Sequence, residues 1–201
     1  QKKKKKAVVP DEEPAAPVDD GKPKPHEPME DRLKKVQALL KQRLQPPLYL
    51  VEVDLVPGMR LRLKDTINFR AGTAVILPSS DMVLDELVRA CKALSDIAAE
   101  FKLPNIHLRV EGHVHQTADE EKCERLSWER PKVVARRVAM GGTPMELLHP
   151  QGFGYSRPLG SAHANRRVEV HLMNHKQVIR EALRRMALME ARSRRGSGSG
   201  S

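Results

Sequence analysis

Three short blocks of the sequence combine histidine, serine and arginine at spacings that could support chemistry. They are 110–115 (Val-Glu-Gly-His-Val-His), 126–130 (Leu-Ser-Trp-Glu-Arg) and 165–170 (Asn-Arg-Arg-Val-Glu-Val). Histidine can transfer a proton or bind a metal near neutral pH, and arginine pairs with carboxylates through its planar fork. Metal binding, catalysis and anion recognition are therefore the functions to weigh first.

The histidines of the first block could indicate a metal site. His113 and His115 are two residues apart, so on a strand they would point to the same face, and His107 would share it. No cysteine or carboxylate in the surrounding pattern completes a recognisable ligand set. We therefore predict no metal site and no cofactor.

Catalysis has little support in the sequence. The chain has no nucleophile elbow, phosphate-binding loop, zinc-protease helix motif or dinucleotide glycine fingerprint. Ser127 has histidines upstream, but its place near the start of an expected helix favours a structural role. We predict that the protein is not an enzyme and that it has no catalytic residues.

The three blocks, in this order, resemble the OmpA-like C-terminal domain, the peptidoglycan-associated module of OmpA, Pal and MotB. The family pattern reads roughly G-H-T-D, then L-S-x-x-R-A, then N-R-R-V-E. In the family, twelve residues separate the aspartate of the first motif from the serine of the second, and His115 and Ser127 have the same separation. The resemblance extends over roughly 48–172.

The resemblance implies a ligand and two residues that would bind it. In the family, the ligand is the diaminopimelate of the cell-wall stem peptide. The aspartate binds its ammonium group, and the arginine binds its carboxylate. Arg130 occupies the arginine position, whereas His115 stands where the aspartate belongs. Imidazole is neutral or cationic, so it is a poor partner for an ammonium.

Two further residues fall at positions where the resemblance implies ligand contact, namely Thr117 and Cys123, and Cys123 replaces an asparagine. Other departures lie close by, with Val114 for a threonine and Pro131 for the alanine after the arginine. Proline in a helix removes one backbone hydrogen bond, so a kink or a restart is expected at Pro131. The ligand site is therefore predicted to be degenerate.

The remaining matched residues are expected to maintain the fold and not to bind a ligand. They are Gly112, His113, Leu126, Ser127, Asn165, Arg166 and Arg167. We expect His113 to be half-buried with its polar atoms satisfied. For Arg130 a structural alternative stays open, an ion pair with Glu129, Glu124 or Asp119.

The hydrophobic pattern predicts an α+β domain. Alternating apolar residues on either side of Pro57-Gly58 predict an antiparallel hairpin, and helical spacing predicts two long helices. The expected elements are strands at 48–55 and 59–63, a helix from about 80 to 101, a strand at 106–111, a helix at about 119–140, a turn at 144–148, a strand near Phe153 and a strand at 167–172. This order is a two-layer sandwich with both helices on one face of the sheet.

The positive charge belongs to the ends of the chain. Residues 46–172 hold 17 Lys and Arg against 16 Asp and Glu, although the whole chain has a net charge of +10. The expected segments are a disordered Lys- and Pro-rich tail (1–28), an amphipathic helix (29–45), the OmpA-like domain (46–173), a basic amphipathic helix (174–193) and a linker or tag (194–201).

Three hypotheses on function follow. The first is a non-catalytic anchoring module that binds the cell-wall peptide, as the resemblance implies. The second is a scaffold component of a larger assembly that has lost this ligand and contacts protein partners through helices 29–44 and 177–189. The third is loose binding of polyanions through the basic ends. The family implies the periplasm or cell envelope, but the sequence shows no signal peptide or membrane span, so we assign no compartment.

Overall fold

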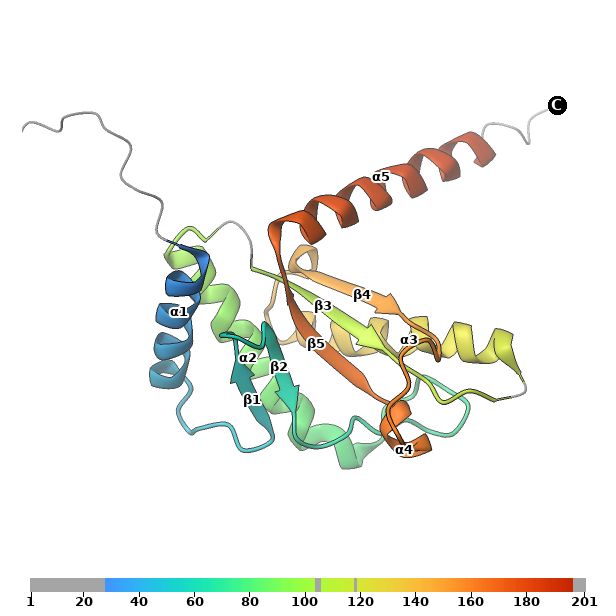
Figure 1. The fold of residues 1–201 in the computed structure, drawn as a ribbon, viewed down its shortest axis with the longest axis horizontal. Coiled ribbons are helices and arrows are strands. Elements are labelled where there is room, and N and C mark those ends of the chain that lie inside the picture. Colours follow the sequence, from blue (N-terminus) through green and yellow to red (C-terminus); the bar gives the residue numbers. More distant parts are fainter. Residues whose placement is uncertain (1–27, 104–105, 118, 197–201) are drawn as a thin grey trace, which may run out of the picture.

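The computed structural model describes residues 28–103, 106–117 and 119–196. Five strands form one mixed sheet in the order β1-β2-β5-β3-β4. Figure 1 shows the helices α2 (Asp81–Glu100) and α3 (Glu120–Met140) behind this sheet, with α1 (Met29–Arg43) beside α2. The predicted α+β sandwich is confirmed, with both long helices on one face.

The predicted hairpin is present as β1 (Val51–Asp54) and β2 (Arg60–Leu63), which pair antiparallel. Val51 and Leu61 are buried beneath α2. Glu86 of α2 secures the start of β1, since its carboxylate accepts hydrogen bonds from the backbone N–H groups of residues 49–51. These bonds lower the pKa of Glu86, although partial burial alone would raise it.

The core lies between the sheet and the two long helices. Each helix has an apolar stripe at helical spacing, and the stripe of α2 is nearly continuous. The buried apolar residues of α2 are Val83, Leu84, Leu87, Ala90, Cys91, Leu94, Ile97 and Ala98. Facing them are alternate residues of β3 (His107–Gly112) and β5 (Val168–Met173), with Leu108, Val110, Val168, Val170 and Leu172 all buried. The apolar side chains that were predicted to alternate along these strands therefore fill the core.

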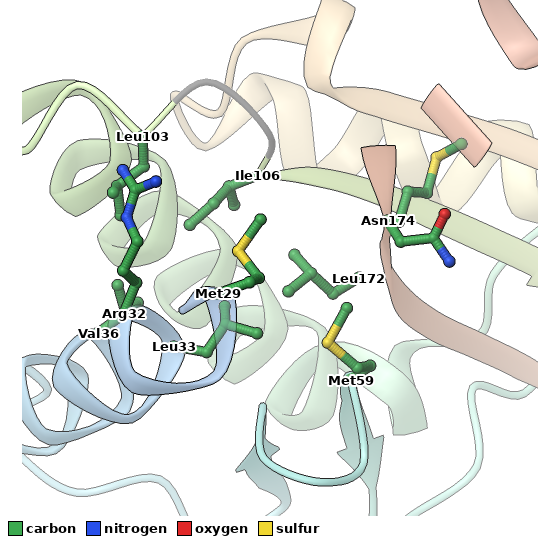
Figure 2. Close-up of a pocket in the computed structure, with 10 residues that line it drawn as sticks. Met29, Arg32, Leu33, Val36, Met59, Leu103, Ile106, Leu172 and Asn174 are labelled. Carbon is green, nitrogen blue, oxygen red and sulfur yellow. The ribbon is translucent and has the colours of Figure 1, made fainter. Parts of the chain in front are cut away.

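Helix α1 extends the core beyond the end of the sheet. Leu33, Val36 and Leu40 are buried, and Arg43 forms an ion pair with Glu100 at the end of α2. A small apolar cavity of about 40 Å³ remains where the first turns of α1 meet Met59, Ile106 and Leu172 (Figure 2). The helix predicted at 29–45 is therefore largely a packing element of the domain.

The fourth strand differs from its prediction. β4 (Leu148–Gly152) pairs parallel with β3 and ends just before Phe153, where the strand was expected. Its central residues, His149-Pro150-Gln151, show no apolar alternation. Proline cannot donate to a sheet ladder but is tolerated on an edge strand, and β4 is the edge of this sheet.

The restart expected at Pro131 as one alternative is not seen, since α3 runs as one helix from Glu120 to Met140. Asp119 caps its N-terminus by accepting a hydrogen bond from the N–H of Lys122 at 2.9 Å. Gly141 and Gly142 follow its last residue, and Gly142 has a positive φ of 99°.

The last helix, α5 (His175–Gly196), is longer than predicted. Asn174 and Gln177 exchange reciprocal side-chain to backbone hydrogen bonds at its start, which fixes where the helix begins. Arg184 lies over the ring of Trp128, 5.6 Å from its centre. Three apolar side chains face solvent on the other side: Ile179, Leu183 and Met186. The helix thus contacts α3 through polar groups and exposes its apolar stripe.

The predicted tail at 1–28 lies outside the described residues except for Pro28, and so does the end of the predicted linker, 197–201. The proposed division of the chain into segments stays a prediction. Among the helices of the described residues, none combines the length and the apolar composition that a membrane span requires.

Candidate functional site

The first two sequence blocks meet where α3 crosses the parallel strands β3 and β4. Gly112 and Gly152 are register partners on these strands. A Cβ on Gly112 would lie 2.1 Å from the Ser127 carbonyl oxygen, and one on Gly152 would lie 2.6 Å from Ser127 Oγ. The two glycines therefore let α3 approach the sheet directly at Ser127, which is completely buried.

Pro131 belongs to the same contact. In a regular helix, the carbonyl of Ser127 would accept a hydrogen bond from the N–H of residue 131, but proline has none. This carbonyl instead faces Gly112, and the Pro131 ring packs against the same glycine. The close contact at Gly112 fixes the position of Arg130, which directly precedes Pro131 on α3.

Arg130 is a buried guanidinium with no carboxylate partner among the described residues. It is 8% exposed. Its Nε donates to the carbonyl of Thr73 at 3.1 Å, and its guanidinium carbon lies 4.8 Å from the centre of the Phe69 ring. Its terminal nitrogens make no hydrogen bond within the described residues. They are also not fully buried, because the fully buried side-chain polar atoms without a partner in the described chain belong to His113 and Thr143. The hydrogen-bonding capacity of these nitrogens is therefore unused within the described residues.

The ion pair considered for Arg130 is absent from the described residues. Asp119 caps α3, and Glu124 accepts a hydrogen bond from the indole of Trp128. Burial lowers the pKa of Arg130, and the charge of Arg166 lowers it further. The second effect reflects the positive charge that Arg166 brings to the site.

The surroundings of Arg130 carry further positive charge. Lys122, in the first turn of α3, extends to Gly72, where a Cβ would lie 3.2 Å from Lys122 Nζ. Gly72 has a φ of 67°, a backbone conformation that favours glycine. The contact between this loop and Arg130 through the carbonyl of Thr73 was not predicted from the sequence.

His115 lies beyond β3, in an exposed loop. Its Nδ1 is 3.5 Å from Nδ2 of Asn165, so the third block approaches the first on this side. The expectation that His107, His113 and His115 share a strand face was wrong, because β3 ends at Gly112 and only His107 lies within it. His107 is instead hydrogen-bonded to His149.

Thr117 and Cys123 contact each other and the backbone of this loop. The hydroxyl of Thr117 and the sulfur of Cys123 are 3.1 Å apart, and the thiol is 3.5 Å from the carbonyl of His115. Cys123 is buried with Val114 and Leu126 in a small apolar cluster. These contacts position the loop that carries His115. Ligand binding by His115, Thr117, Cys123 and Arg130 stays a prediction.

His113 is fully buried and not half-buried as expected. Its ring stacks on Phe153, and its Nε2 lies 3.3 Å from Glu111 Oε2, close enough for an ion pair but outside hydrogen-bond geometry. Nδ1 has no partner among the described residues, so the prediction of satisfied polar atoms was also wrong. The backbone N–H of His113 donates to the carbonyl of Arg167, joining the first and third blocks.

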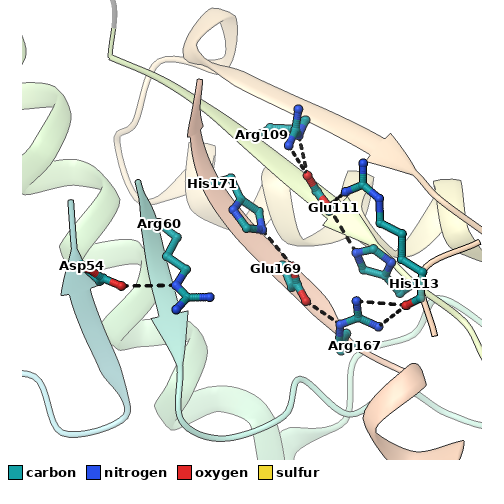
Figure 3. Close-up of polar contacts among 9 residues, drawn as sticks. Asp54, Arg60, Arg109, Glu111, His113, Arg167, Glu169 and His171 are labelled. Atoms are coloured by element: carbon teal, nitrogen blue, oxygen red, sulfur yellow. Dashed lines mark hydrogen bonds and ion pairs between the residues drawn. The ribbon is translucent and has the colours of Figure 1, made fainter. Parts of the chain in front are cut away.

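The face of the sheet opposite the helices carries a charged network that was not predicted from the sequence (Figure 3). Glu111 is completely buried and lies between Arg109 and Arg157. Glu169 accepts hydrogen bonds from Arg167 and His171. The hydrogen bonds from His171 and Arg167, the first being the larger effect, outweigh burial and lower the pKa of Glu169 to about 2. Charged residues two positions apart on β3 and β5 were the signal for this network.

Three members of this network, Glu111, Glu169 and His171, bring ligand atoms within 4.8 Å of one another and could hold a metal ion. Both carboxylates already bind arginines, so a cation would have to displace them. The arrangement is better suited to balancing charge within the sheet.

The third block fixes the start of β5. Asn165 Oδ1 accepts a hydrogen bond from the N–H of Leu159, and Arg166 donates to the carbonyl of Ala162. The Arg167 side chain binds both Glu169 and the carbonyl of Arg157. These contacts organise the loop before β5.

No protein-family profile matches the sequence, and no curated protein sequence matches it. Solved structures do resemble the chain. The fold is similar to that of OmpA-like domains. An outer membrane protein of Borrelia burgdorferi B31 is 20% identical, with a TM-score of 0.46 over 62% of this chain and 97% of that one.

Two further structures are similar. The OmpA-like domain of FopA1 from Francisella tularensis subsp. tularensis SCHU S4 is 21% identical, with a TM-score of 0.41 over 52% of this chain and 67% of that one. The periplasmic domain of Helicobacter pylori MotB is 20% identical, with a TM-score of 0.40 over 58% of this chain and 78% of that one. At these identities the similarity concerns the fold alone.

Proposed function

We propose that this protein is a non-catalytic, OmpA-like binding and anchoring module that takes a carboxylate at Arg130. One observation carries the proposal, namely that the buried guanidinium of Arg130 has no acidic partner among the described residues. The sequence pattern places Arg130 at the carboxylate-binding position of the OmpA-like family.

The energetics favour an incoming anion. A buried charge without a counter-ion is costly, and a well-placed partner offsets much of that cost. The single hydrogen bond to Thr73 and the contact with Phe69 leave most of the fork unused. A carboxylate can bind both terminal nitrogens at once, which is the strongest form of this hydrogen bond.

The ammonium of diaminopimelate would find no negatively charged side chain at the position of His115. His115 offers no negative charge, and its ring is turned toward the amide of Asn165. The nearby positive charges of Lys122 and Arg166 would repel an amine further. The site therefore favours a carboxylate ligand that lacks an adjacent ammonium.

Several contacts support a non-catalytic role. The hydroxyl of Ser127 is buried and donates to the carbonyl of Glu124 at 2.7 Å. It is therefore used within the helix and is unsuited to attack a substrate. His115, the exposed histidine, lies next to Asn165 and not next to a nucleophile.

A scaffold role in a larger assembly is the second candidate. It is favoured by the outward apolar stripe of α5, with Leu183 61% and Met186 58% exposed. Such a stripe on a basic helix suits contact with a protein partner. The resemblance to the OmpA-like family supports a place in the cell envelope.

Calorimetry with two ligands tests the proposal. Diaminopimelate and pimelate share the same carbon chain and carboxylates, but pimelate lacks both amines. We expect the native chain to bind diaminopimelate no more tightly than pimelate. The His115→Asp variant should bind diaminopimelate about fivefold more tightly than the native chain does. A charge pair at an exposed or half-exposed position contributes about 1 kcal/mol, which corresponds to this factor. A native chain that prefers diaminopimelate would contradict the proposal, and a chain that binds neither ligand would favour the scaffold role.

A further inference from the structure

The sheet forks between β2 and β5. Their antiparallel pairing covers Arg60↔His171 and Leu61↔Val170 and then stops, although β2 continues to Leu63 and β5 begins at Val168. Figure 3 shows the two strands diverging from this point. A hollow of about 270 Å³ lies in the fork.

Backbone groups point into this fork. The N–H of Lys64 donates to Leu50, on the β1 side, and the N–H of His113 donates to Arg167, on the β3 side. Because backbone groups alternate in direction along a strand, those of Leu63 and Val168 face each other across the fork. The ladder that would have paired them has already ended, so each strand presents a free edge there.

The rim of the hollow is basic. One side of the rim carries Arg62 of β2 and Lys64, which directly follows β2. The other side carries Arg167 and His163 from the segment leading into β5. Four Lys or Arg side chains line the hollow against two acidic ones, Asp65 and Glu169. Lys64 makes no ion pair with any other described residue, so its charge is available.

On its other edge β2 pairs with β1, so the sequence of β1 shows which residue pattern fits beside β2. β1 places Val51 and Val53 toward the core side and Glu52 and Asp54 on the outer face. Arg62 lies 3.9 Å from Glu52 and 3.7 Å from Asp54. A strand that alternates apolar and acidic residues therefore matches β2 on both of its faces.

We propose that the fork is a binding site for an extended peptide segment of alternating apolar and acidic residues. The peptide backbone would pair with the free edges at Leu63 and Val168. Its acidic side chains would meet Lys64, Arg167 and His163. This is strand addition, in which main-chain hydrogen bonds give affinity and side-chain contacts give specificity. The site lies between β2 and β5 and does not depend on carboxylate binding at Arg130.

The test uses the isotope-labelled full chain and the blocked peptide acetyl-Val-Glu-Val-Asp-amide, which has the sequence of β1. Binding is followed by amide NMR shifts and by hydrogen exchange. We expect shifts around residues 62–66 and 167–171, and slower exchange at the amides of Leu63 and Val168. Lys64→Glu should weaken binding at least tenfold. Arg136→Glu, an equal change of charge at an exposed position of α3, should leave it within twofold.

Two further probes make the outcome decisive. Acetyl-Val-Lys-Val-Lys-amide should not bind, because it carries the wrong charge for the rim. Acetylglutamate should bind far more weakly than the tetrapeptide and protect neither amide. The proposal is overturned if the acidic tetrapeptide causes no shifts at the fork, or if acetylglutamate reproduces its effects, since the site would then bind only a free anion.

Discussion

At the scale of single residues, two glycines determine how closely the helix layer approaches the sheet. Gly112 faces the Ser127 carbonyl, and Gly152 faces the Ser127 hydroxyl and the Trp128 ring. The position of Arg130 depends on this contact, since Arg130 is three residues beyond Ser127 on α3. The glycine and the serine of the family pattern thus act as one packing unit.

Gly112→Ala should lower the free energy of unfolding by about 1–3 kcal/mol, because the new methyl group would overlap the Ser127 carbonyl. Chemical denaturation measures this change. Gly160→Ala is the matched control, since no atom lies within 4 Å of its added Cβ. Equal stabilities of the two variants would contradict the packing role of Gly112.

Acid stability should depend on Glu169. Its folded pKa of about 2 lies below the ordinary value of 4.5. Stabilisation by this carboxylate is therefore complete above about pH 4.5 and is lost as the pH falls toward 2. Glu169→Gln should flatten the decline of unfolding free energy across that range, as measured by denaturation at a series of pH values. Glu146→Gln, at an exposed site, should leave the decline unchanged.

At the scale of elements, α5 is the least integrated part of the fold. It meets α3 through Arg184 and Trp128, and its apolar stripe is exposed. The sequence pattern correctly predicted an amphipathic helix. It could not predict which side would face the domain, because periodicity identifies an apolar face without showing what covers it.

Trp128 is the single tryptophan of the chain, so it reports on the contact with α5. Arg184→Ala should make Trp128 more accessible to acrylamide, seen as stronger quenching of its fluorescence. Arg180→Ala removes an exposed arginine one turn earlier and should not change quenching. If neither variant alters quenching, α5 does not rest on Trp128 in solution.

Other elements differed in how well the sequence predicted them. The hairpin and the long helices follow from local periodicity and turn residues. β4 was misplaced because His149-Pro150-Gln151 lacks alternation and is stabilised by its neighbour β3. α3 passes through Pro131 because the freed Ser127 carbonyl and the proline ring both pack against Gly112. Such compensation comes from tertiary contacts and cannot be read from one segment.

At the scale of the whole molecule, the candidate site joins residues that are far apart in the sequence. Arg130 is held by Thr73, 57 positions earlier, and His115 approaches Asn165, 50 positions later. The motif spacing singled out Arg130, but the absence of a carboxylate partner for it among the described residues became visible only in the folded chain. The outer charged network and the fork between β2 and β5 likewise depend on strand order, which the sequence pattern did not provide.

The central claim is that Arg130 binds a carboxylate. The most direct measurement is a pimelate titration of the native chain and of Arg130→Gln, followed through the Nε–H resonance of Arg130 and through calorimetry. We predict that pimelate shifts this resonance in the native chain and that Arg130→Gln weakens binding at least tenfold, with its fold retained. Pimelate binding of equal strength to both proteins, or a resonance that does not move, would contradict the claim.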